Sequence, residues 1–267
     1  MKIWKKALLL TLIVYPFITF GQLRNELSAN KNLAVIELRN YLLRPGQREN
    51  FTNLFEANFI ISQQEAGSCT LGQYKVKGAE NHFFWIRGFE SMASRNKALN
   101  DFYTSIIWKQ NRSTANSMIL NNDNVHLLKP LNISDSTNEA SFNSNWFGRQ
   151  KGFAVIDFYI SNTKLDKLIE FVKKQYSYML SKANIENTSF WVSETSINDF
   201  PALPVFQDKN LLVQISFYKD ELEYRTKMKA LKSEMNDQQE TDMADLVTVK
   251  NTLLIYPTKK SFSYSQK

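Results

Sequence analysis

The sequence predicts an α+β protein that contains two tandem copies of one β-α-β-β-α-β unit. Three segments of the first half have counterparts, in the same order, in the second half. AVIE from Ala34 corresponds to AVID from Ala154, and NHFFWIRGFES from Asn81 corresponds to NLLVQISFYKD from Asn210. The third pair is LLKP from Leu127 and LIYP from Leu254. The 267 residues, 43% of them hydrophobic, are enough for two domains of ordinary size, each with its own core.

The first unit opens with a strand at residues 33–43, because two sets of side chains alternate along it. One set contains Ala34, Ile36 and Leu38, and the other contains Val35, Glu37, Arg39 and Tyr41. Arg44-Pro45-Gly46 ends the strand and opens a helix, since proline suits the first helical turn. One face of that helix carries apolar residues at helical spacing: Phe51, Leu54, Phe55 and Phe59.

Two further strands, a helix and a fourth strand complete the first unit. Strands are predicted at residues 70–76 and 82–87, with a turn at residues 77–81 between them. A helical stretch runs from residue 91 to about residue 118, and a last strand at residues 125–128 follows it. Tyr103, Trp108 and Arg112 lie on the helical stretch, where we favour a packing role over the rim of a pocket.

The second unit, residues 150–260, repeats this order after a linker rich in Asn and Ser at residues 132–149. Its first helix carries apolar residues at helical spacing: Leu165, Leu168, Ile169, Val172, Tyr176 and Leu180. A second helix spans residue 220 to about residue 235. The second strand must lie within residues 187–206, beside Pro201 and Pro204.

Each unit is predicted to be ferredoxin-like, with four antiparallel strands and two helices on one face; the first occupies residues 33–131. We expect its helices to cover Ala34, Ile36 and Leu38. The opposite face of the sheet would then meet the matching face of the second unit, and the two sheets would pair as an α/β barrel. Tandem units can close this barrel within one chain, and a homodimer formed through outer surfaces stays an open alternative.

Residues 1–21 have the pattern of a secretory signal peptide. A basic start precedes an uncharged apolar run at residues 7–20, and small residues place the cleavage between Gly21 and Gln22. The run is shorter than the about 20 residues that span a bilayer, and no cysteine follows it to receive a lipid. We expect an exported bacterial protein, periplasmic or secreted, without a stable membrane anchor; a buried N-terminal helix or an uncleaved anchor is the alternative.

The net charge of +7 does not indicate a nucleic-acid partner. Cleavage would lower the charge to +4, because three lysines leave with the leader, and no basic stripe with interleaved aromatic residues is present in the sequence. The only cysteine, Cys69, has no second cysteine with which to form a disulfide. We interpret Cys69 as a packing residue rather than a nucleophile.

Several segments of the first unit resemble the NIPSNAP family. They are ELRNY from Glu37 with Pro45-Gly46, FWIRGFESM from Phe84, Phe102-Tyr103 followed by Trp108, and DNVHLL from Asp123. The resemblance covers residues 33–131 and, more loosely, the second half. It implies the dimeric α/β-barrel superfamily, whose members include monooxygenases, haem-handling proteins, isomerases and binding modules, so the fold does not select among these functions.

The candidate ligand-binding residues form a stripe that is expected to face the barrel interior. It consists of Glu37, Arg39, Tyr41 and Arg87 in the first unit and of Asp157 and Tyr159 in the second. Such groups in a half-dry cavity could bind a polar small molecule, and Glu37 or Asp157 could act as a general base. The favoured interpretation is an ionic network that ties the two sheets together, because buried charges need partners.

The sequence predicts no metal and no cofactor, since it has no HExxH motif, no CxxC motif and no glycine-rich phosphate loop. Of the two histidines, His82 and His126, the second could be a haem ligand, although a hydrogen-bonded strand histidine is the favoured interpretation. The predicted function is that of an exported NIPSNAP-like module that binds a small molecule. A cofactor-independent oxygenase or isomerase that uses Glu37 or Asp157, and a haem-binding protein, are the alternatives.

Overall fold

The structure is a computed structural model that describes residues 30–133, 142–162 and 165–261. The predicted signal peptide and its cleavage site at Gly21 and Gln22 lie outside these residues, as do the middle of the predicted linker and the extreme C-terminus. Within the described residues, no helix is long and apolar enough to cross a membrane.

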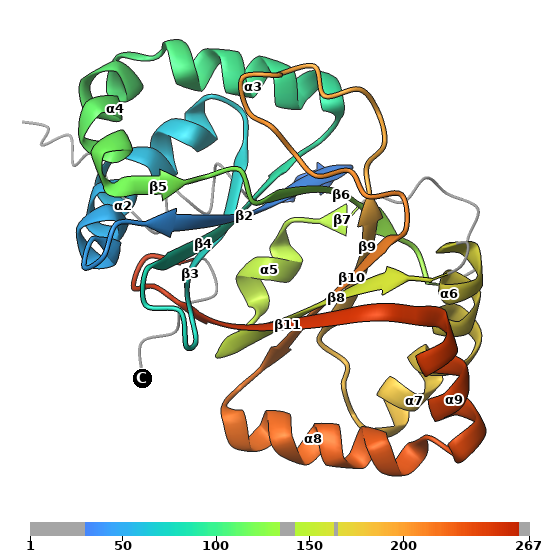
Figure 1. The fold of residues 1–267 in the computed structure, drawn as a ribbon. Coiled ribbons are helices and arrows are strands. Elements are labelled where there is room, and N and C mark those ends of the chain that lie inside the picture. The colour runs from blue at the N-terminus through green and yellow to red at the C-terminus, as the bar shows by residue number, and fades with distance from the viewer. Residues whose placement is uncertain (1–29, 134–141, 163–164, 262–267) are drawn as a thin grey trace, which may run out of the picture.

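The first unit follows the predicted order of elements (Figure 1). It consists of β2 (Val35–Leu43), α2 (Arg48–Glu65), β3 (Cys69–Val76), β4 (His82–Phe89), α3 (Met92–Thr104), α4 (Ile106–Met118) and β6 (Val125–Leu131). The long helical stretch breaks at Ser105, whose backbone is extended and whose hydroxyl accepts a hydrogen bond from the Trp108 N–H at 3.1 Å. This serine therefore ends α3 and caps α4. A short strand that the sequence did not reveal, β5 (Ile119–Asn121), pairs with the end of β2.

The second unit repeats the order with two additions. It consists of β8 (Phe153–Ser161), α6 (Leu165–Phe171), the π-helical η1 (Val172–Tyr176), α7 (Ser177–Lys182), β9 (Thr188–Ser193), β10 (Leu211–Tyr218), α8 (Glu221–Glu234), α9 (Asp237–Leu246) and β11 (Val247–Pro257). The π-helical turn and α9 are additions to the predicted order of this unit, and α9 follows α8 as α4 follows α3 in the first unit. Strand β9 ends before Pro201 and Pro204, so neither proline has to supply a hydrogen bond within the sheet.

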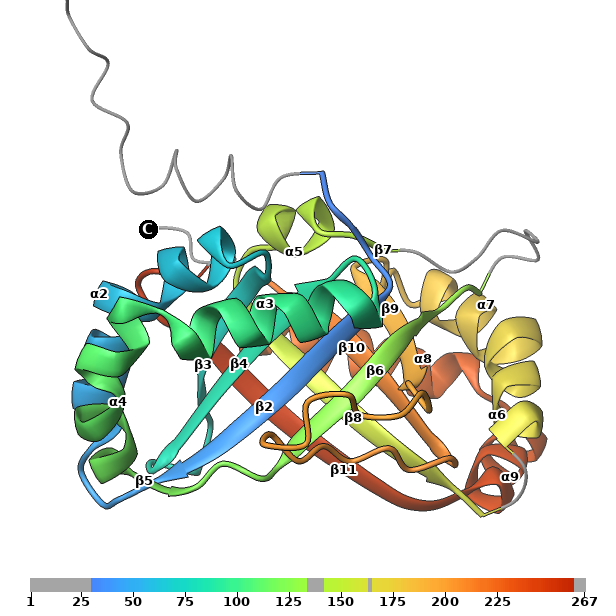
Figure 2. The same ribbon diagram turned by 90° about the horizontal axis from the view of Figure 1, so that it is seen from above.

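The strands of both units form one closed barrel, which confirms the predicted fold class. The order is β3-β4-β2-β6 in the first unit and β9-β10-β8-β11 in the second. Antiparallel pairing of β6 with β9, and of β3 with β11, joins the two sheets at both edges. The helices lie on the outside, with α2, α3 and α4 over the first sheet and α6, α7, α8 and α9 over the second (Figures 1 and 2).

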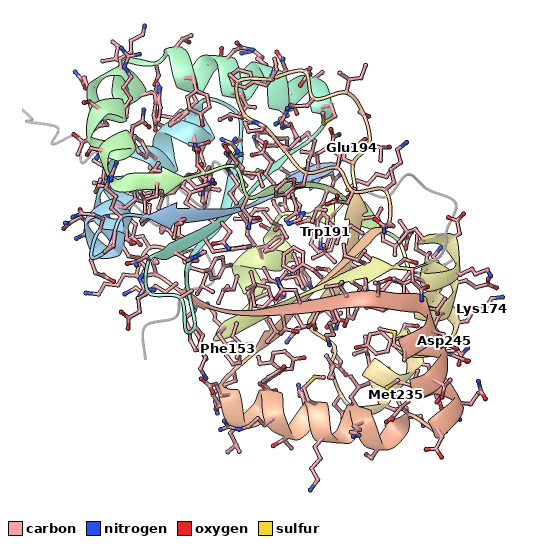
Figure 3. All side chains as sticks on the ribbon, in the orientation of Figure 1. Phe153, Lys174, Trp191, Glu194, Met235 and Asp245 are labelled. Atoms are coloured by element: carbon pink, nitrogen blue, oxygen red, sulfur yellow. The ribbon has the colours of Figure 1, made fainter. Side chains whose placement is uncertain are left out.

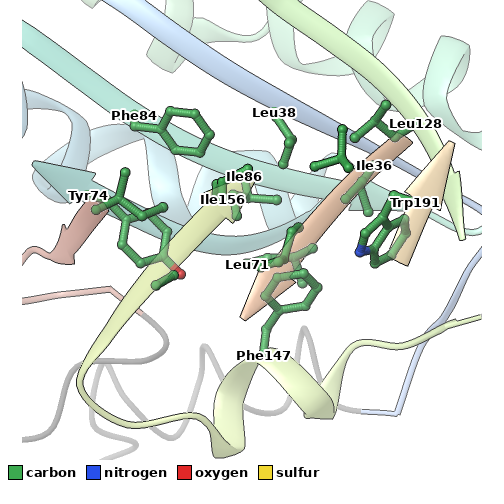
Figure 4. Close-up of a cluster of buried hydrophobic side chains, with 14 of the residues drawn as sticks. Ile36, Leu38, Leu71, Tyr74, Phe84, Ile86, Leu128, Phe147, Ile156 and Trp191 are labelled. Carbon is green, nitrogen blue, oxygen red and sulfur yellow. The ribbon is translucent and has the colours of Figure 1, made fainter. Parts of the chain in front are cut away.

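The prediction of which strand face points inward was wrong. Ile36 and Leu38 belong to the cluster inside the barrel, where they meet Ile156 and Ile215 of the second unit (Figure 4). The alternate side chains of β2, among them Tyr41, pack toward the helices of their own unit. A small barrel is filled by side chains, and the apolar set fills it without leaving polar atoms unpaired. The polar set instead meets partners on the helices and on β4.

The predicted linker is partly structured. Its described end forms the two-residue strand β7 (Phe142–Asn143), which pairs with β1 (Asn32–Leu33), and the short helix α5 (Asn145–Arg149). Phe147 of α5 is fully buried and closes one end of the barrel, where its side chain joins the interior cluster (Figure 4).

Candidate functional site

A fully buried ionic cluster lies between the first sheet and its helices. Glu37 on β2 accepts hydrogen bonds from three arginines, each with an N–O distance of 2.7 Å. Arg39 Nη1 and Arg87 Nε donate to Glu37 Oε2, and Arg95 Nε donates to Oε1. The pairing register of β2 and β4 places Glu37 opposite Arg87, while Arg95 comes from α3. The structure thus unites four of the predicted site residues, Glu37, Arg39, Tyr41 and Arg87, but outside the barrel.

The cluster carries more positive than negative charge. Three guanidinium groups surround one carboxylate, and the only other described acid in an ion pair with them is Asp199, whose half-exposed side chain lies 3.4 Å from Arg95 Nη1. Arg95 Nη2 is buried and has no hydrogen-bond partner within the described residues. Burial alone would raise the pKa of Glu37, but Arg87, Arg39 and Arg95 outweigh it and hold this pKa well below its usual range. Glu37 is therefore ionised, and one positive charge stays in excess.

A cavity of about 340 Å³ adjoins this cluster, between the outer face of the sheet and helices α2, α3 and α4. Its wall is largely aromatic: Tyr41, Phe51, Phe55, Phe59, Trp85, Phe102, Tyr103, Trp108 and Phe200. Trp108 lines this cavity, in agreement with the less favoured interpretation of this residue as part of a pocket. Arg112 does not line it and is exposed on α4. The volume lies at the lower end of the range of about 300–1,000 Å³ for small-molecule sites.

The arginines lie directly behind the wall of the cavity. Arg39 Nε donates to the Tyr41 hydroxyl at 2.9 Å, and Arg87 Nη1 donates to Gln63 Oε1 at 3.0 Å. The Arg87 guanidinium also lies 5.0 Å from the centre of the Trp85 ring. Tyr41, Gln63 and Trp85 all line the cavity, so three of the polar side chains that a ligand would meet there are next to a buried cation.

Tyr103 adds a neutral phenol to the same wall. Burial raises the pKa of Tyr103, and the nearby arginines Arg87 and Arg39 do not reverse this shift. The phenol therefore stays protonated near neutral pH and keeps a proton to donate.

The segment between β9 and β10 completes this site, although it belongs to the second unit. We call residues 194–210 the strap; it begins at Glu194, at the end of β9 (Figure 3), and crosses the outer face of β2 and β6 (Figure 2). Phe200 stacks on Tyr103 with ring centres 5.8 Å apart, and Leu203 also lines the cavity. Asn198 accepts a hydrogen bond from Arg95 Nη1 at 3.0 Å.

The sequence did not reveal two parts of this site. Arg95 is separated from Glu37 by 58 positions and lies on a helix whose spacing shows only an apolar face. The strap has no helical or strand periodicity around Pro201 and Pro204, so nothing in its pattern indicates that it crosses to the other unit.

Asp157 and Tyr159 do not join the other predicted site residues. They occupy the equivalent strand of the second unit and face the helices of that unit. The prediction that the candidate residues of both units form one stripe inside the barrel was therefore wrong. The Thr252 hydroxyl donates to Asp157 Oδ1 at 2.5 Å, and Lys250 Nζ lies 3.3 Å from the same oxygen. Tyr159 donates to Gln214 Oε1 at 3.2 Å.

The two histidines have different surroundings. His82 Nδ1 lies 2.9 Å from Asn40 Oδ1. The favoured interpretation of His126 as a hydrogen-bonded strand histidine does not hold for its Nδ1, which is buried and has no hydrogen-bond partner within the described residues. His126 lies at one end of the barrel, between the rings of Phe158 and Phe206 at 5.0 and 5.3 Å, beside a cavity of about 220 Å³. This volume is below the range for drug-sized ligands, and a porphyrin is larger than most of them, so the cavity beside His126 does not enclose a haem.

Cys69 has the predicted packing role. It is fully buried in the cluster inside the barrel, and burial raises the pKa of its thiol to about 12. The thiol is therefore protonated near neutral pH and a poor nucleophile.

The comparison with known proteins confirms the family resemblance of the first unit. Residues 36–135 match the NIPSNAP family model. A search of curated proteins found no match.

Solved structures share the fold over most of the chain. A candidate monooxygenase from Fusobacterium nucleatum is 12% identical, with a TM-score of 0.55 over 88% of this chain and 99% of that one. A candidate monooxygenase from Lactobacillus acidophilus is 11% identical, with a TM-score of 0.54 over 86% and 98% of the two chains. A haem-binding protein from Thermus thermophilus is 11% identical, with a TM-score of 0.50 over 85% and 92%. At these identities the similarity establishes the fold and not the function.

Proposed function

We propose that the cavity of the first unit binds a small organic anion with an aromatic or apolar body. The observation that carries this proposal is the excess of buried positive charge, three arginines around Glu37, directly behind an aromatic cavity. A buried cation without a counter-charge is costly, and an anionic ligand would lower that cost. The aromatic wall would at the same time bury the apolar body of the ligand.

The polar groups of the wall suit a carboxylate better than a cation. The Tyr41 hydroxyl already accepts from Arg39, so its own proton is available to a ligand. Trp85 Nε1 is a buried donor with no partner within the described residues, and an indole N–H cannot accept. Tyr103 supplies a further phenolic proton. The anionic end is therefore expected to lie near Tyr41 and Trp85, with the body among the rings of α2 and α3.

Binding is better supported than proton abstraction by Glu37. Its two oxygens are occupied by three arginines, and its lowered pKa makes it a weak base. Glu37 also does not line the cavity. The oxygenase or isomerase alternative would therefore need another base, and Asp157 lies in the other unit.

Calorimetric titration with phenylacetate and with its uncharged amide, phenylacetamide, tests the proposal. A hydrogen bond to a charged group contributes about 1.5–3 kcal/mol, so we expect phenylacetate to bind at least about tenfold more tightly. The Ala115→Phe variant should abolish binding of both, because Ala115 lines the cavity and the larger ring would fill it. Equal affinity for the two compounds, or binding unaffected by Ala115→Phe, would contradict the proposal.

We also propose that the protein is exported, on the pattern of residues 1–21. The intact mass of material secreted by a bacterial host should correspond to a chain that begins at Gln22. A mass that includes Met1 would contradict export through a cleaved leader.

A further inference from the structure

The two ends of the barrel are closed differently. At one end, Phe147 of α5 lies 6.4 Å from Phe217, ring centre to ring centre, near the C-terminal end of β10. At the N-terminal end of the same strand, Leu211 lines an open cavity of about 220 Å³. The second end therefore has no counterpart of Phe147 among the described residues that line it, and room is left inside the barrel.

The barrel-end cavity has apolar walls and a polar rim. Leu38, Phe84, Phe158 and Leu211 are buried or nearly buried and form the walls. The rim carries His126 and three side-chain amides, from Asn40, Asn124 and Asn251. No charged side chain of the described residues lines this cavity.

His126 supplies an unsatisfied hydrogen-bonding atom at this rim. Its Nδ1 is buried and has no partner within the described residues. Burial lowers the pKa of His126, against a smaller opposing effect of Asp208, so the ring is neutral near pH 7. A neutral imidazole has one donor and one acceptor nitrogen, and one of the two is left for a ligand.

We propose that the barrel end is a second ligand site, which takes a compact uncharged aromatic molecule that carries one hydroxyl or N–H group. Phenols and indoles are the matching class. Their ring would lie against Phe84, Phe158 and Leu211, and their polar group would bond to His126 Nδ1 or to an amide of the rim. An anion would lose its hydration here without meeting a cation. This site therefore favours uncharged ligands, whereas the cavity of the first unit favours anions.

Water alone fills such a cavity poorly. A buried water needs about two to four polar partners, and the polar atoms lie only at the rim. Waters against Leu38, Phe84 and Leu211 would lack partners, so an apolar ring that displaces them gains free energy.

The strap passes beside this site. Phe206 donates its N–H to the Val125 carbonyl at 2.7 Å and accepts from Leu127 N–H at 3.2 Å, which continues the edge of β6 beyond β9. Phe206 is 45% exposed, and its ring lies against that of His126. One segment thus lines the first cavity through Phe200 and contacts His126 of the second through Phe206.

Calorimetric titration of the full chain with indole tests the inference. We expect saturable binding that falls at least fivefold in His126→Phe, which keeps a ring but removes both nitrogens. The Ala115→Phe variant should leave indole binding unchanged while it abolishes phenylacetate binding, so failure of one site is distinguishable from failure of the other. The inference is overturned if indole does not bind, or if Ala115→Phe abolishes indole binding while His126→Phe leaves it unchanged.

A measurement on the unaltered protein removes any dependence on the folding of the variants. The chain has two histidines, so the nitrogen resonances of their side chains are simple to resolve. Indole should shift the Nδ1 resonance of His126 more than any resonance of His82, whose Nδ1 already lies 2.9 Å from Asn40. A spectrum in which saturating indole leaves His126 unmoved would overturn the inference.

Discussion

Equivalent positions of the two units carry different chemistry. Glu37 and Asp157 occupy the same place on the first strand of each unit, opposite Arg87 in one unit and opposite Gln214 in the other. Two positions further along, Arg39 corresponds to Tyr159. The first unit therefore buries cations where the second buries an amide and a phenol.

The space between sheet and helices differs in the same way. In the first unit it contains the aromatic cavity of about 340 Å³. In the second unit, leucines, tyrosines and methionines pack over β8 and β10, and Phe153 and Met235 lie among them (Figure 3). The connection between the two middle strands also differs, since the first unit has a tight turn at residues 77–81 and the second has the strap. The two units thus share the barrel architecture, while the buried cations and the aromatic cavity lie in the first unit alone among the described residues.

The largest expected effect comes from removing the shared carboxylate of the first unit. Glu37→Gln leaves three buried arginines without their main counter-charge, so the free energy of unfolding should fall by about 3–5 kcal/mol. Asp157→Asn, in the second unit, should cost only about 1 kcal/mol, because the amide oxygen can still accept from Thr252 and the lost ion pair with Lys250 is partly exposed. Urea unfolding of both variants measures the difference. Similar losses of the free energy of unfolding would contradict the distinction between the ionic cluster around Glu37 and the surroundings of Asp157.

Substitution of two alanines allows a direct comparison between the cavity of the first unit and the packed space between sheet and helices in the second unit. Ala115 lines the cavity of the first unit, and Ala183 lies in the packed cluster of the second; both are almost fully buried. Phenylalanine at Ala183 should destabilise the protein by about 1–3 kcal/mol through overpacking, whereas phenylalanine at Ala115 should cost less than about 1 kcal/mol. Thermal unfolding in the absence of ligand is the measurement, and a larger loss at Ala115 would contradict the cavity.

The strap should matter for ligand binding more than for the fold. Phe200→Ala removes the ring that stacks on Tyr103, an interaction of about 0.5–1.5 kcal/mol. We expect the affinity for phenylacetate to fall by roughly 2–12-fold, as this range of free energy implies. Phe206→Ala, at the other cavity, is the matched control and should leave phenylacetate binding unchanged.

Small effects are expected from the removal of two tyrosine hydroxyls, one in each unit. Tyr41→Phe removes a hydroxyl that faces the cavity, so it should weaken phenylacetate binding by about 0.5–1.5 kcal/mol. Tyr159→Phe removes a hydroxyl that donates to Gln214, so it should lower stability by a similar amount and leave binding unchanged. Titration of both variants would contradict the assignment if Tyr159→Phe weakened binding as much as Tyr41→Phe.

The fold was predictable because it depends on local patterns. Alternation predicted β2 almost to its ends, and the repeat of AVIE as AVID placed β8 correctly. The direction of the strand faces was not predictable in the same way, because both faces of β2 are buried. Alternation distinguishes two sets of side chains, but it does not tell which set meets the barrel and which meets the helices.

The candidate site was predictable only in part, for a related reason. Glu37, Arg39, Tyr41 and Arg87 lie on two paired strands, so their polar character within apolar runs was visible in the sequence. Arg95 and Asp199 reach the cluster through tertiary contacts, from a helix and from the strap of the other unit. These contacts decide the net charge of the cluster, and with it the kind of ligand that we propose.

The affinity of Asp199→Asn for phenylacetate is the most direct test of the central claim. Asp199 is the half-exposed acid beside Arg95, so its neutralisation raises the excess positive charge while the buried pairs of Glu37 stay intact. We predict that the variant binds phenylacetate about two- to fivefold more tightly, a gain of less than about 1 kcal/mol for one half-exposed charge, and phenylacetamide unchanged. Unchanged or weaker binding of phenylacetate would contradict an anion site whose specificity comes from the arginine cluster.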